Sequence, residues 1–171
     1  MDVYMVVLRL IHIVAGVLWA GWTFSLVLFV EPAVRLAGSE GGKFMQTMAG
    51  KTRIVQILAA APGLVILSGV LMYYRVSGGL NPGWITSGTG LALTIGALAA
   101  IAAFISGMVI NRPAAQRMAV LSREMQSAGG PPSPAQLAEL RAQQERLSQG
   151  GLYAAILLLI AVIGMSVAEY L

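Results

Sequence analysis

The chain has 171 residues, of which 57% are hydrophobic and 11% are charged, whereas a soluble domain carries roughly 25% charged residues, so the composition indicates an integral membrane protein. The net charge of +4 does not indicate nucleic-acid binding, because basic residues of membrane proteins collect in cytoplasmic loops. The lack of cysteine excludes disulfides and thiol catalysis, and a single histidine excludes the usual multi-histidine zinc site within one chain.

Four segments are apolar over enough residues to cross a lipid bilayer as helices, which takes about 20 residues each. A helix satisfies its backbone polar groups internally, as hydrocarbon demands. We therefore expect an all-α fold, with residues 1–171 forming one membrane domain built as a four-helix bundle. The expected spans are residues 3–30, 54–74, 85–110 and 150–170.

The connection after the first span contains one proline and several glycines. Pro32 predicts a kink or the end of the first helix, because proline lacks the N–H that continues a helix. Further along, Phe44, Met45 and Met48 indicate a short amphipathic segment at the membrane surface.

Residues 111–149 form the only long polar connection and predict a helical hairpin between spans three and four. The stretch AAQRMAVLSREMQ favours helix, so the third span is expected to continue to about Gln126. After the breaker GGPPSP, a returning helix begins with Ser133 as N-cap, Pro134 in the first turn and Gln136 as capping-box partner. We interpret the hairpin charges as a solvated face, with a docking site as the alternative.

The basic residues predict the orientation of the bundle. Nine of the eleven lysines and arginines lie in the first and third connections, and the other two, Arg9 and Arg75, lie on the opposite side. The positive-inside rule therefore places both termini outside and the hairpin in the cytoplasm. The nine are Arg35, Lys43, Lys51, Arg53, Arg112, Arg117, Arg123, Arg141 and Arg146.

The first span carries the only histidine, and ionisable residues at membrane depth are functional by default. At about 100° per residue, His12, Gly16 and Trp19 share one helix face, with Met5 and Arg9 nearer the outer surface. This stripe predicts a site for haem b, in which His12 ligates iron, Gly16 clears space for the ring and Trp19 packs against it.

Two arginines are candidates for the haem propionates. Arg9 lies one turn nearer the outer surface than His12, and Arg75 lies at the outer end of the second span. The alternative is that Arg9 pairs with Asp2 or Glu169, while His12 hydrogen-bonds to a neighbouring helix and Gly16 with Trp19 simply packs the bundle.

Two other functions stay open at this stage. Met5, Met72 and Met165 all fall in the outer half with His12, and thioether with imidazole suits Cu(I), so copper binding or transfer is one alternative. The other is a non-catalytic accessory subunit that packs against a larger membrane complex or forms a homo-oligomer. Whether the protein is an enzyme stays open, because neither a Ser-His-Asp set nor paired carboxylates lie at one depth.

The string His12-x6-Trp19-x-Gly21, followed by an apolar run and Pro32, resembles the first helix of CopD-like copper-resistance membrane proteins. It also resembles uncharacterised small bacterial membrane proteins, as do the stretches GVLMYYRVSGG and PSPAQLAELRAQQERL, so this similarity covers nearly the whole chain. These resemblances imply the bacterial inner membrane and copper handling. The first helix alone is similar to HemJ-type protoporphyrinogen oxidases, which implies a haem-ligand role for His12.

Overall fold

The computed structural model describes residues 2–171, and every regular element in that range is helical. Four helices there are long and apolar enough to cross a membrane, which confirms the all-α class and the number of expected spans. The elements are α1 (Val3–Ser25), η1 (Leu26–Val30), α2 (Glu31–Lys51), α3 (Ile54–Val76), α4 (Pro82–Ile85), α5 (Gly88–Ser106), η2 (Gly107–Asn111), α6 (Arg112–Ser127), α7 (Pro134–Val167) and η3 (Ala168–Tyr170).

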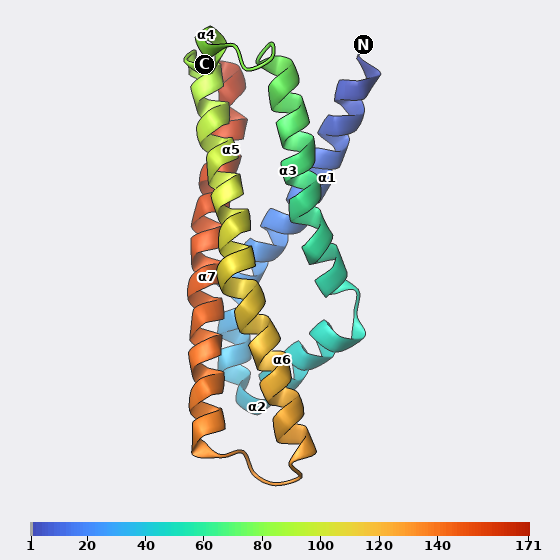
Figure 1. Ribbon diagram of the computed structural model, residues 1–171, viewed down its shortest axis with the longest axis vertical. Coiled ribbons are helices and arrows are strands. Elements are labelled where there is room, and N and C mark those ends of the chain that lie inside the picture. The colour runs from blue at the N-terminus through green and yellow to red at the C-terminus, as the bar shows by residue number, and fades with distance from the viewer. Residues whose placement is uncertain (1) are drawn as a thin grey trace.

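The helices form an elongated bundle with both chain ends and α4 at one end, which we call the terminal end (Figure 1). The opposite end, where the chain turns from α6 into α7, is the hairpin end (Figure 1). Helix α1 packs mainly on α3, and α5 packs mainly on α7. The two helix pairs meet in a central core of small and apolar side chains: Ala15, Trp19, Ala61, Val65, Ala103 and Leu158.

The first helix does not end at Pro32. The short π-helical segment η1 precedes this proline, and the Glu31 N–H bonds to the Leu26 carbonyl, five residues back rather than four. This wider turn shifts the hydrogen-bond register just before a residue that has no N–H to donate, so the chain continues as α2. The break comes later, at Gly38, whose φ of 55° and ψ of −122° interrupt the helix.

The third span repeats this arrangement. In η2 the Arg112 N–H bonds to the Gly107 carbonyl, directly before Pro113, and the helix then continues as α6 to Ser127. This confirms the expected continuation to about Gln126. The span begins at Gly88 rather than at residue 85, because the Ser87 side chain accepts a hydrogen bond from Gly90 N–H and caps α5.

The returning helix α7 begins as the sequence predicts. Ser133 Oγ accepts from the Gln136 N–H at 3.3 Å, and the Ser133 N–H donates to Gln136 Oε1 at 2.9 Å, which completes the capping box around Pro134. Helix α7 then runs without interruption into the fourth apolar span. Helix α6 and the first half of α7 lie side by side at the hairpin end (Figure 1).

Candidate functional site

His12 lies on α1 and faces α3. Its Nδ1 is 3.0 Å from the Val65 carbonyl oxygen and 3.2 Å from Ser68 Oγ. The Ser68 hydroxyl donates its own proton to the Leu64 carbonyl at 2.5 Å, so its oxygen is left as an acceptor. The acceptors around Nδ1 therefore place the imidazole proton on Nδ1, and in the neutral ring Nε2 carries the lone pair.

The sequence of α3 makes room for this imidazole. A Cβ at Gly69 would lie 3.0 Å from His12 Cε1 and 3.4 Å from Nδ1, so the glycine lets the ring lie against the helix backbone. Ser68, beside it, is 2% exposed, and its hydroxyl contacts both the Leu64 carbonyl and His12 Nδ1. His12 therefore hydrogen-bonds to a neighbouring helix, as the alternative interpretation expects. The same contacts fix the orientation of its ring.

The remaining residues of the predicted stripe separate in space. A Cβ at Gly16 would meet nothing within 4 Å, so the position one turn from His12 borders open space. Trp19, in contrast, is only 8% exposed and packs in the central core with Ala61 and Val65. This burial matches the alternative interpretation, in which Trp19 packs the bundle instead of contacting a haem ring. The indole lies inside the bundle rather than on an open face.

Both candidate arginines are exposed, Arg9 in the second turn of α1 and Arg75 in the last turn of α3. Arg75 Nη2 is 3.6 Å from Asp2 Oδ2, an exposed ion pair that joins the start of α1 to the end of α3. The structure therefore pairs Asp2 with Arg75 and not with Arg9, the alternative partner expected from the sequence. Within residues 2–171, Arg9 makes no ion pair.

The candidate methionines are divided between the two helix pairs. Met5 and Met72 are half-buried on α1 and α3, the pair that carries His12. Met165 lies on α7 against Gly96 of α5, where its Cγ would be 3.5 Å from a Cβ at that glycine. The structure thus groups Met165 with the other helix pair. Among residues 2–171, no three histidine or carboxylate side chains are grouped to hold a metal ion.

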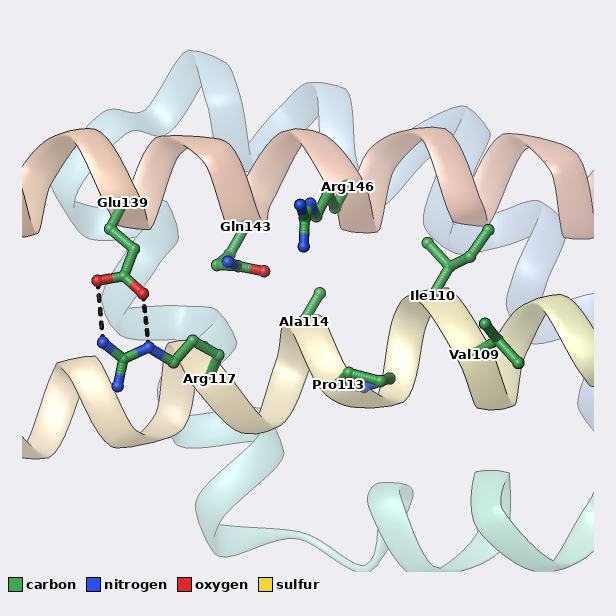
Figure 2. A pocket seen from close by; sticks show the side chains of 8 residues that line it. All are labelled: Val109, Ile110, Pro113, Ala114, Arg117, Glu139, Gln143 and Arg146. Carbon is green, nitrogen blue, oxygen red and sulfur yellow. Dashed lines mark hydrogen bonds and ion pairs between the residues drawn. The ribbon is translucent and has the colours of Figure 1, made fainter.

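A second feature is a groove between α6 and α7, in the hairpin whose charges predict a solvated face or, as the alternative, a docking site (Figure 2). It encloses about 490 Å³. The pattern that indicates it is the spacing of Glu139, Gln143 and Arg146, which places three polar side chains on one face of α7. The lining residues are Val109, Ile110, Pro113, Ala114, Arg117, Glu139, Gln143 and Arg146.

One side of this groove is fixed by an ion pair between the two helices. Arg117 Nε and Nη2 donate to the two Glu139 carboxylate oxygens at 2.5 and 2.9 Å (Figure 2). These bonds favour the ionised carboxylate and lower the pKa of Glu139 below its ordinary value. Arg117 is also 3.7 Å from Glu124 of its own helix, so two carboxylates compensate its charge.

The two features differ in chemistry. The α1–α3 face presents an oriented imidazole whose Nε2 makes no hydrogen bond within residues 2–171, which can bind a single metal centre but supplies only one strong ligand. The α6–α7 groove presents basic and amide donors next to apolar side chains, which suits an amphipathic anion.

No protein-family model, curated protein or solved structure matches this chain, so its function is inferred from these residues alone.

Proposed function

We propose that this chain is a bacterial inner-membrane protein that binds b-type haem through Nε2 of His12, in a redox or electron-transfer role. The observation that supports this function is the bond from the Nδ1–H to the Val65 carbonyl. Metal-ligating histidines almost always donate their other N–H to a carbonyl, a carboxylate or water, which fixes the tautomer and makes the ligand more basic. His12 has this arrangement inside an apolar helix, where an ionisable group is costly to place.

The surrounding residues fit haem in part. His12 supplies the nitrogen ligand, Gly16 leaves open space one turn away, and Arg9 is exposed toward the terminal end, where it can receive a propionate. Trp19 and Arg75 fit haem less well, because Trp19 is in the core and Arg75 is paired with Asp2. Bound haem supplies a one-electron iron couple. The protein's own contribution is to hold the imidazole neutral and oriented through Val65.

The chain has one histidine to offer a haem. His12 would hold a bound haem alone, together with a methionine, or together with His12 of a second copy of the chain. The methionines of the same helix pair, Met5 and Met72, are the candidates for the second arrangement. The proposal therefore makes His12 indispensable whichever of the three arrangements holds.

The orientation belongs to the same proposal. Both termini lie outside, and the hairpin of residues 111–149 lies in the cytoplasm, because the basic residues concentrate at the hairpin end. His12 then lies in the outer half of the bilayer, with Arg9 nearer the outer surface.

Haem titration of the purified protein tests the proposal. Protein in detergent is titrated with haem, and we expect a Soret shift that saturates at one haem per chain, or at one per two chains in the bis-histidine case. His12→Ala abolishes the shift. In His12→Gly, added imidazole restores it, because the small residue leaves room for a free ligand.

The matched control is Ser68→Ala. It removes the side-chain contact of His12 but keeps the bond to Val65, so haem stoichiometry is retained. A Soret shift that is unchanged in His12→Ala contradicts the proposal. If wild-type protein binds neither haem nor stoichiometric copper, the accessory-subunit alternative is favoured, and the His12–Val65 bond then serves only to join α1 to α3.

Copper remains the second candidate for a metal at the same helix pair, because Met5, Met72 and His12 belong to α1 and α3. Two results together would favour copper. The protein would bind one copper per chain and lose it in Met5→Leu or Met72→Leu, and the haem titration would give no Soret shift.

A further inference from the structure

The groove between α6 and α7 changes character along its length. One end is formed by Val109, Ile110 and Pro113, where the third apolar span passes through η2 into α6. Val109 is 68% exposed, as expected for a side chain that faces lipid. Arg117 and Glu139 form the other end, and Gln143 and Arg146 lie between the two ends (Figure 2). An amphipathic molecule would therefore meet matching surfaces at both ends.

One basic side chain of the groove has no partner among the described residues. Arg117 is held by Glu139 and lies near Glu124, so its charge is already compensated. Arg146, on the same groove, makes no hydrogen bond or ion pair with any residue of the range 2–171. The Gln143 amide lies between Glu139 and Arg146 on α7 and adds N–H donors (Figure 2).

We propose that this groove binds an anionic phospholipid. Arg146 and Gln143 bind the headgroup phosphate, and an acyl chain lies along Val109 and Ile110 toward the apolar span. The unpaired guanidinium of Arg146 supports an anion, and the continuity of the apolar end with the span supports a lipid rather than free phosphate. The proposal rests on the membrane location, and it does not depend on haem at His12, which lies on a different helix pair.

Native mass spectrometry of the full chain tests it. The protein in detergent is offered equal amounts of phosphatidylglycerol and phosphatidylcholine, and the retained lipids are counted. We expect wild-type protein to retain phosphatidylglycerol preferentially. Arg146→Gln reduces this preference about fivefold, as expected for one basic residue near an anionic headgroup.

Two further variants separate the site from general surface charge. Arg141→Gln removes the same charge from the same helix at an exposed position outside the groove, so it leaves the preference unchanged. Gln143→Glu adds a negative charge beside Arg146 without removing a basic residue, and it weakens the preference as Arg146→Gln does. Circular dichroism of each variant checks that the helical content is retained.

Three results would overturn the proposal. Wild-type protein with no preference for phosphatidylglycerol rules out an anionic-lipid site, and equal losses in Arg146→Gln and Arg141→Gln show diffuse charge attraction instead. Inorganic phosphate that removes the bound lipid at equimolar concentration identifies a free-anion site. The Soret titration of His12 is read separately, so a failure of the haem proposal leaves this result interpretable.

Discussion

At the residue scale, His12 illustrates how a polar side chain is accommodated between apolar helices. A buried polar group that lacks a hydrogen bond is costly, and the Val65 carbonyl and Ser68 hydroxyl supply acceptors for its Nδ1–H. The space comes from Gly69, which has no Cβ to oppose the ring. Nδ1 is thereby satisfied, and Nε2 makes no hydrogen bond within residues 2–171.

Close helix packing yields a prediction at a single residue of α7. A Cβ at Gly164 would lie 2.8 Å from the Ala92 carbonyl oxygen and 3.2 Å from the Cα of Gly96, both backbone atoms of α5. Backbone cannot move aside as a flexible side chain can, so Gly164→Ala must separate the two helices. We expect Gly164→Ala to lower the unfolding free energy by about 1–3 kcal/mol, measured by thermal or denaturant unfolding in detergent.

Gly21→Ala on α1 is the control for this substitution, because a Cβ there would meet nothing within 4 Å. Its stability should stay equal to wild type or rise slightly, since alanine favours helix over glycine. Equal stabilities of the two variants would show that α5 and α7 are farther apart at Gly164 than in the structure.

At the scale of elements, the two π-helical segments share one neighbour. Both η1 and η2 precede a proline, and both contact α7 near a pair of adjacent glycines. A Cβ at Gly150 would overlap the Asn111 side chain of η2, and one at Gly151 would lie 3.3 Å from Val27 Cγ2 of η1. These small residues let α7 approach both helices where their registers shift.

The α6–α7 hairpin should lose stability in acid. Hydrogen bonds from Arg117 lower the pKa of Glu139, so the ionised carboxylate stabilises the folded pair. This contribution is complete above the ordinary glutamate pKa and is lost as the pH falls through the lowered folded value. We expect hydrogen-exchange protection of the hairpin amides to decrease, relative to the apolar spans, as the pH is lowered from neutral to below the ordinary glutamate pKa.

Glu139→Gln serves as the comparison for this pH dependence. It removes the titrating group, so its hairpin protection should already be reduced at neutral pH and should change less on acidification. The loss of hairpin protection should be modest, because the Arg117 and Glu139 side chains are both partly exposed to solvent. Identical pH profiles for the two proteins would assign the acid sensitivity to another group.

At the scale of the whole molecule, the orientation can be measured directly, because the chain contains no cysteine to interfere with labelling. Tyr170→Cys places a thiol at the terminal end, and Gly130→Cys places one in the turn between α6 and α7. In intact cells, a membrane-impermeant maleimide should label Tyr170→Cys only. Labelling of Gly130→Cys alone would invert the orientation, and both should react after the membrane is permeabilised.

The sequence by itself determined the helical class, the four spans and the start of α7 at Ser133, because these depend on local features: hydropathy over a span, helix propensity and the capping box. It also selected His12 by its chemistry. It did not reveal that the helix continues through Pro32, because a π-helical turn is a register shift that residue type alone does not specify.

Only the tertiary structure decided what each side chain meets. The rotation of α1 against α3 places His12 beside Val65 and Trp19 in the core, and the approach of the two termini joins Asp2 to Arg75. The groove likewise exists only because α6 and α7 lie side by side. Such contacts depend on the mutual orientation of helices that are far apart in sequence. The helical repeat predicts which residues share a face, but it does not predict which helix packs against that face.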